Sequence, residues 1–184
     1  FRRVLFRSRE ARSSAHNQIR QAISPFLSSA VGPRWLIHEE TKAAQTGLIL
    51  RRVPIELVPI SPSGPSTGDG PPAFRDLGNW QPDWILVSDT RRRIAIVDLC
   101  RPADTCPDKL ATAGIRKQRK YEPLVSALGH YTAHGWVVHV FPWVVGLRGF
   151  IDTAHIGALL DFLEIPKPRL REAVERSEIG RAHV

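Results

Sequence analysis

Residues 82–100 read PDWILVSDTRRRIAIVDLC, in which two apolar runs, Trp84–Ser88 and Ile94–Leu99, flank the polar stretch 89–92. Short runs rich in isoleucine and valine on either side of a polar turn predict a β-hairpin. Apolar residues occupy both alternating positions of each run, as expected where helices cover both faces of a sheet. The stretch therefore predicts the central strands of an α/β domain.

The same hairpin brings two aspartates together. If residues 89–92 form the loop, Ser88 pairs with Arg93 and Asp83 lies opposite Asp98. Opposed side chains have Cβ atoms about 4.5–5.5 Å apart, and like charges at that separation repel. A proton, a cationic side chain or a divalent metal must offset the repulsion. This arrangement depends on the register of the two strands, because a shift of one residue would move one carboxylate to the other face of the sheet. Two solvated aspartates at strand ends are the alternative.

Outward from the hairpin, apolar spacing predicts further elements on both sides. Helices are expected over 11–30, 109–128, 156–163 and 169–176, and strands over 35–38, 48–60 and 136–145. Pro25 and Pro123 are expected to break or kink the first two helices. Residues 61–72 consist mostly of Ser, Pro and Gly, which predicts a flexible loop. The order predicts an α/β domain with a mixed central sheet flanked by helices.

Composition narrows the class of protein. The 184 residues are 42% hydrophobic, enough for one domain with a core. A net charge of +8 favours a polyanionic partner. Two cysteines cannot build a disulfide scaffold, which favours a reducing compartment. The longest apolar stretch, 136–145, is far short of the roughly 20 residues of a membrane span, so no membrane partner is expected.

Both ends of the chain resemble translated sequencing adapter. The DNA sequence TTCAGACGTGTGCTCTTCCGATCT encodes residues 1–8, and its reverse complement, with the first codon completed as GAG, encodes residues 178–184 followed by a stop. One oligonucleotide accounts for both ends. We therefore expect 1–8 and 178–184 to be non-biological and 9–177 to be a fragment of a longer polyprotein.

A basic helix follows the hairpin. Lys117 and Lys120 are three residues apart, which places both amines on one helical face, and Tyr121 follows them. At least one amine could reach the aspartate pair from there. A solvated basic face is the alternative.

The order of these motifs resembles the restriction-like endonuclease domain of site-specific non-LTR retrotransposon polyproteins, a branch of the PD-(D/E)-x-K nuclease superfamily. The resemblance covers roughly residues 15–150 and implies an αβββαβ core. It is carried by AHN at 15–17, QPD at 81–83, IAIVDLCRP at 94–102, KQRKYEPL at 117–124 and VVGLRG at 144–149.

The resemblance implies a nuclease that nicks target DNA so that the freed 3′ hydroxyl primes reverse transcription. Asp83 and Asp98 would hold Mg²⁺ or Mn²⁺, and a lysine would stabilise the transition state. The superfamily places that lysine two residues after the second acid, where this chain has Cys100. The catalytic role is therefore assigned to the helix, to Lys117 first and Lys120 second.

Further residues are expected at the site or on DNA. Glu39 or Glu40 would add a metal ligand, the alternative being a plain exposed pair. DNA phosphates would be contacted by Arg91, Arg92, Arg93, Arg116, Arg119, Tyr121 and, at the site or on DNA, His16. Solvated charges are the alternative for these basic residues. Double-stranded DNA, a reverse transcriptase domain in the same polyprotein and a nuclear location are the implied context.

Some features depart from the family's pattern. Gln81 stands where Arg or Lys is usual, and the segment 61–72 is an unusual insertion. A zinc set of Cys100, Cys106, His130 and His134 is disfavoured, because Cys100 is expected to be a buried core thiol. A decayed DNA-binding remnant and an unrelated PD-(D/E)-x-K enzyme of repair or restriction remain as alternatives.

Overall fold

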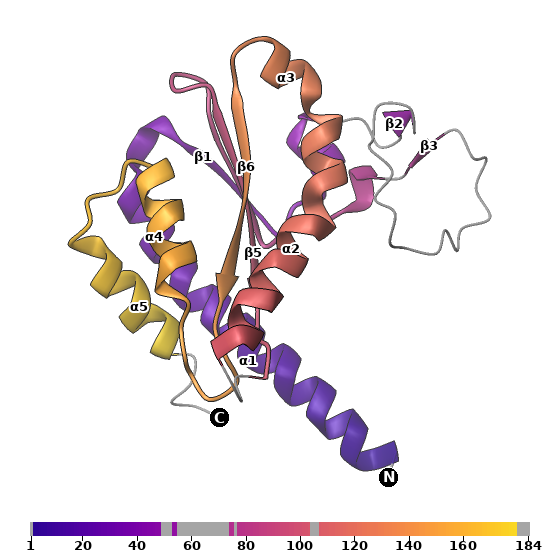
Figure 1. Ribbon diagram of the computed structural model, residues 1–184, viewed down its shortest axis with the longest axis vertical. Coiled ribbons are helices and arrows are strands. Elements are labelled where there is room, and N and C mark those ends of the chain that lie inside the picture. Colours follow the sequence, from indigo (N-terminus) through magenta and orange to yellow (C-terminus); the bar gives the residue numbers. More distant parts are fainter. Residues whose placement is uncertain (1, 49–52, 55–73, 76, 104–106, 180–184) are drawn as a thin grey trace.

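A computed structural model describes residues 2–48, 53–54, 74–75, 77–103 and 107–179 (Figure 1). The main sheet comprises β1 (Leu36–Glu39), β4 (Trp84–Ser88), β5 (Arg93–Cys100) and β6 (Val137–Val144). The α-helices are α1 (Arg2–Val31), α2 (Pro107–Ala127), α3 (Gly129–Ala133), α4 (Thr153–Phe162) and α5 (Arg169–Ile179). This is the predicted α/β class, and its long elements begin in the expected order αβββαβ.

The sheet is mixed, with strand order β1-β4-β5-β6. The β1–β4 and β4–β5 pairs are antiparallel, whereas β6 runs parallel to β5 after the chain crosses over through α2. The hairpin has the predicted register, from Ser88 opposite Arg93 to Trp84 opposite Val97. Asp83 and Asp98 therefore lie immediately beyond the last pair.

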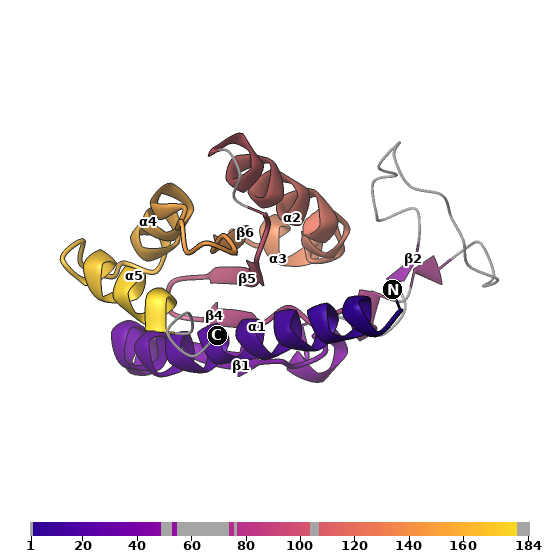
Figure 2. The same ribbon diagram turned by 90° about the horizontal axis from the view of Figure 1, so that it is seen from below.

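Helices cover both faces of the sheet. One face packs against α1, α4 and α5 through a buried cluster that includes Trp84, Val97 and Trp143. The other face packs against α2 through a cluster that includes Ile85, Ile96 and the ring of Tyr121. Figure 2 shows α4 and α5 on one side of the strands and α2 and α3 on the other. This sandwich explains why both parities of each strand are apolar.

The two helices with internal prolines continue through them, contrary to the predicted breaks. Pro25 lies inside α1 and Pro123 inside α2. In α1 the hydroxyl of Ser24 donates to the carbonyl of Arg20, and Ile23 is fully buried in the core. Tertiary packing of the apolar face therefore holds the helix together where proline removes a backbone hydrogen bond.

The strand predicted over 48–60 is mostly outside the described residues, and the loop predicted over 61–72 is entirely outside them. The described part of that strand, β2 (Val53–Pro54), pairs with β3 (Phe74–Arg75) in a small separate sheet. Of the end segments 1–8 and 178–184, which are expected to be non-biological, residue 1 and residues 180–184 are likewise outside. Residues 2–8 lie in α1 and residues 178–179 in α5. In the part of the chain that is described, no helix is long and apolar enough to span a membrane.

Candidate active site

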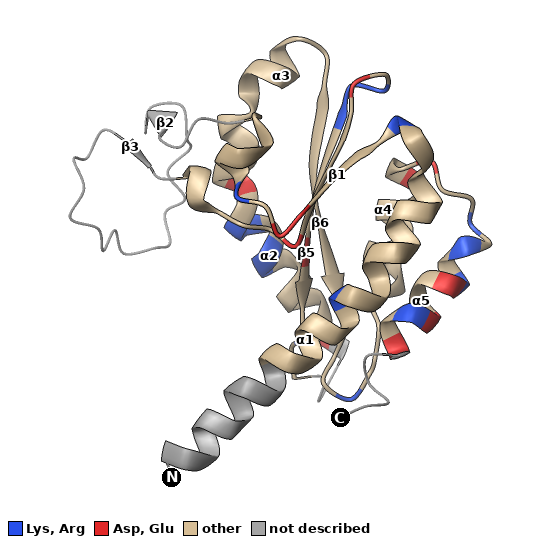
Figure 3. Cartoon of the chain, turned by 180° about the vertical axis from the view of Figure 1, so that it is seen from behind, with Lys and Arg blue, Asp and Glu red and all other residues tan. Residues whose placement is uncertain are grey.

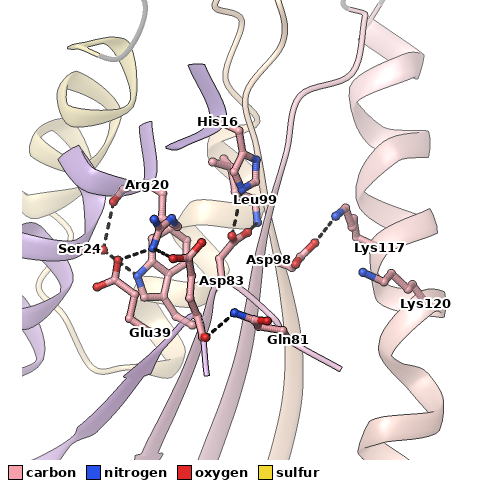
Figure 4. A network of polar contacts seen from close by, with 12 residues as sticks. His16, Arg20, Ser24, Glu39, Gln81, Asp83, Asp98, Leu99, Lys117 and Lys120 are labelled. Carbon is pink, nitrogen blue, oxygen red and sulfur yellow. Dashed lines mark hydrogen bonds and ion pairs between the residues drawn. The ribbon is translucent and has the colours of Figure 1, made fainter. Parts of the chain in front are cut away.

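The hairpin places Asp83 and Asp98 where β4 begins and β5 is about to end, a position called here the open end. Both residues are buried, at 8% and 5% exposure. Asp83 Oδ2 accepts a hydrogen bond of 2.6 Å from the backbone N–H of Leu99, the residue after Asp98. The backbone beside Asp98 therefore holds the carboxylate of Asp83 next to the second aspartate (Figure 4). Buried like charges at this spacing require donors around them.

Helix α1 supplies the donor that faces Asp83. His16 Nε2 lies 3.0 Å from Asp83 Oδ1, and the His16 side chain is about one-third exposed. Together with the Leu99 N–H, this contact gives each oxygen of Asp83 one partner. The expectation that His16 reaches the site therefore agrees with its position, while its contact with DNA stays a prediction.

Helix α2 supplies two donors to Asp98. Lys117 Nζ donates to Asp98 Oδ2, and the phenol of Tyr121 donates to Asp98 Oδ1 at 2.9 Å. Lys117 and Tyr121 are four residues apart and share one helical face. That face packs on the side of the sheet where Ile96 and Asp98 point by strand alternation. The structure thus brings Lys117 into direct contact with the acid pair.

Lys120 reaches the pair through Tyr121. Its Nζ donates to the Tyr121 hydroxyl at 2.9 Å and lies 4.4 Å from the centre of the tyrosine ring. Partial burial lowers the pKa of the Lys120 ammonium, and Lys117 adds to the lowering while Asp98 counteracts it. Lys117 is the direct partner of the carboxylate and Lys120 the indirect one.

Tyr121 does not occupy the DNA-contacting position predicted for it. Its side chain is 1% exposed, and its hydroxyl is engaged by Asp98 and Lys120. Burial, and then the negative charge and hydrogen bond of Asp98, raise the pKa of the phenol. The spacing from Lys117 put Tyr121 on the inward face of α2, so the prediction of DNA contact is corrected to a buried role at the site.

Cys100, two residues after Asp98, is a buried thiol as expected. It packs with Ala113 of α2 and Val144 of β6. Burial raises the pKa of the thiol to about 11. The amine that contacts Asp98 is supplied instead by Lys117 of α2.

The expected third acid, Glu39, is held elsewhere. Arg20 Nη1 forms ion pairs with Glu39 at 2.8 Å and with Glu40 at 2.9 Å. Glu39 lies opposite Trp84, whose side chain is buried on the α1 face. The structure therefore does not group Glu39 with Asp83 and Asp98, and its metal role stays a prediction.

The predicted arginines fall into two regions, the tip of the hairpin and helix α2. Arg91 and Arg93 at the hairpin tip pair with Glu164, and Arg92 donates to the carbonyl of His134. Arg116 is exposed on α2, and Arg119 lines a pocket between α2 and β6. Figure 3 shows the blue and red segments of the hairpin tip separated along the strands from the red segments at the open end.

Sequence reasoning missed Arg20 and the N–H of Leu99. Arg20 is 8% exposed, and it lies one helical turn after His16 on the same face of α1. The i, i+4 spacing of His16 and Arg20 was the available signal. No residue pattern in the sequence indicated the Leu99 N–H as a donor. A backbone N–H becomes free to bind a side chain only where the pairing of β4 with β5 ends.

The donor set at the open end fits a magnesium-type cation. Mg²⁺ is usually bound by one or two carboxylates, with waters and substrate phosphates completing its octahedron. Each oxygen of Asp83 and Asp98 has one hydrogen-bond partner and, when ionised, room for a second. Among the described residues no group of three or more His, Cys, Asp or Glu side chains is placed to hold a metal. A two-carboxylate site is the arrangement that these residues offer.

No protein-family model matches this chain, and no curated protein matches it. The chemistry of the site therefore has to be argued from its own geometry.

Proposed function

We propose that the open end is the active site of a metal-dependent DNA endonuclease. The observation that carries the proposal is the buried pair of Asp83 and Asp98 with Lys117 donating to Asp98. Two carboxylates can hold a metal ion, and an adjacent amine can stabilise negative charge, which together suit hydrolysis of a phosphodiester. The proposed class is the restriction-like endonuclease of non-LTR retrotransposons, with a reverse transcriptase domain in the same polyprotein and chromosomal DNA in the nucleus as substrate.

Each residue at the open end has a proposed role that follows from its position. Asp83 and Asp98 would hold Mg²⁺ or Mn²⁺, which when bound neutralises charge on the scissile phosphate. Lys117 is placed to interact with the same phosphate or with the attacking water, since its amine already lies against Asp98. His16 orients Asp83 from the opposite helix. Arg116, which is exposed one residue before Lys117, would contact the DNA backbone.

Nicking of supercoiled plasmid by the full chain tests the proposal. Relaxed circles should accumulate with Mg²⁺ or Mn²⁺ and not with EDTA. Asp98→Asn should abolish nicking, because the amide offers one neutral oxygen in place of a charged carboxylate. Asp89→Asn is the matched control, since Asp89 is an exposed aspartate at the other end of the same hairpin.

The outcomes separate the alternatives. Nicking that persists in Asp98→Asn would place the activity outside this site or in a contaminant. Salt-dependent DNA binding without metal-dependent nicking would favour the decayed DNA-binding remnant.

A further inference from the structure

The phenol of Tyr121 joins the helix to the second aspartate. Its ring is buried on the α2 side of the sheet and contacts the ring of Trp80 edge-on, with centroids 5.7 Å apart. Its hydroxyl lies 2.9 Å from Asp98 Oδ1 and 2.9 Å from Lys120 Nζ. Figure 4 shows Lys117 and Lys120 extending from one helix toward the strand that carries Asp98.

The direction of these hydrogen bonds follows from the donors available. A lysine ammonium has three protons and no lone pair, so it can only donate to the Tyr121 oxygen. The single proton of the phenol is then free to go to Asp98 Oδ1. With Lys117 on Oδ2, both oxygens of Asp98 are held by donors four residues apart on one helix. Rotation of the carboxylate would break both contacts.

We propose that Tyr121 is a positioning residue that fixes the Asp98 carboxylate for a divalent cation. The inference rests on the proposed metal site at the open end. Each oxygen of Asp98 accepts one hydrogen bond from α2 and keeps a lone pair for the ion. Partners that orient a metal ligand in this way typically contribute 10- to 100-fold to metal affinity.

Binding of Mn²⁺ to the full chain, followed by electron paramagnetic resonance of the free ion, tests the proposal without DNA or catalysis. Tyr121→Phe keeps the ring against Trp80 and removes only the hydroxyl, so Mn²⁺ should bind at least tenfold more weakly. The matched control is Tyr131→Phe. Tyr131 lies on α3 against Trp136, with ring centroids 5.2 Å apart, and contacts neither aspartate in the described structure. Its removal should leave Mn²⁺ affinity unchanged.

Equal Mn²⁺ affinity in the wild type and Tyr121→Phe would overturn the positioning role while leaving the metal site intact. Binding that is absent in the wild type, or unaffected by Asp98→Asn, would overturn the proposed metal site and the inference with it.

A second experiment follows Tyr121 by fluorine magnetic resonance and does not remove its hydroxyl. The chain has two tyrosines, so 3-fluorotyrosine incorporated into Tyr131→Phe labels Tyr121 alone. Its fluorine resonance should shift on addition of Mg²⁺, and Asp98→Asn should abolish the shift. A resonance that Mg²⁺ does not move would contradict the role of Tyr121.

Discussion

The two ends of the β4–β5 hairpin both gather charged side chains, about 17 Å apart along five strand residues, and they are built in opposite ways. At the open end Asp83 and Asp98 are buried beside each other, with donors arriving from α1 and α2. At the tip Arg91 and Arg93 are partly exposed and paired with the acid Glu164.

The difference in burial and in the sign of neighbouring charges distinguishes an ordinary surface ion pair at the tip from a candidate active site at the open end. The tip pairs unlike charges near solvent, an arrangement worth at most about 1 kcal/mol and common on protein surfaces. The open end buries like charges, which costs stability unless other groups offset it. Buried clusters of ionisable side chains are concentrated at functional sites. Substitutions at the open end should therefore have larger effects on activity than substitutions at the tip.

The largest effect is expected from the acid pair. Asp83→Asn and Asp98→Asn should each slow plasmid nicking about a thousandfold, because losing one charged ligand removes several kcal/mol of transition-state stabilisation. The double variant should be no slower than either single variant, since the two acids act as one unit. Initial rates of loss of supercoiled DNA measure this.

Asp89→Asn, beside the tip, should change that rate by less than about twofold, as surface substitutions usually have small effects. A comparable loss in Asp89→Asn, or additive losses in the double variant, would contradict the division between the two ends.

The next effect distinguishes the two lysines of α2. Lys117→Met should lower the nicking rate about a hundredfold, the usual effect of removing one group that stabilises transition-state charge. Lys120→Met should lower it less, because Lys120 reaches Asp98 only through Tyr121. Both substitutions keep the length of the side chain. A larger loss in Lys120→Met would assign the catalytic amine to Lys120, and equal losses would contradict the ranking of Lys117 above Lys120.

A smaller effect concerns stability at high pH. Burial raises the pKa of the Cys100 thiol from 9.0 to about 11, so the folded protein keeps a proton that the unfolded chain loses. A raised pKa contributes stability that is present below pH 9 and is lost as the pH rises toward 11. Between pH 8 and pH 10 the loss should be on the order of 1 kcal/mol.

Urea unfolding of the wild type and Cys100→Ala at pH 8 and pH 10 measures this loss. The alanine variant lacks the thiol, so the wild type should lose more stability than the variant over this interval, by on the order of 1 kcal/mol. Parallel losses in the two proteins would show that the thiol is not protected by burial.

The smallest effect compares basic residues near the two ends. Arg116→Ala should reduce the slope of log binding constant against log salt by about one, the value of one phosphate contact. Arg91→Ala should reduce it less, because Glu164 already neutralises that guanidinium. Titration of a duplex at several salt concentrations measures both slopes. A larger change in Arg91→Ala would move the DNA footprint to the tip.

Local pattern predicted the hairpin well, because a polar loop of fixed length between apolar runs sets the register of Asp83 and Asp98. The same logic placed Lys117 on a face toward them. It failed for Tyr121 and did not predict that Glu39 pairs with Arg20, because both arrangements depend on packing between distant elements. A tyrosine after two lysines resembles an exposed DNA contact until the helix docks, and Glu39 finds Arg20 only when α1 meets β1.

The most direct test is a crystal of the chain with Mn²⁺ and a short DNA duplex, examined for anomalous scattering from the metal. The account predicts a metal peak about 2.1 Å from a carboxylate oxygen of Asp83 and of Asp98, with a DNA phosphate beside it and near Lys117. The account would be contradicted if the open end held no Mn²⁺ at saturating concentration and the phosphates of the bound DNA lay far from it.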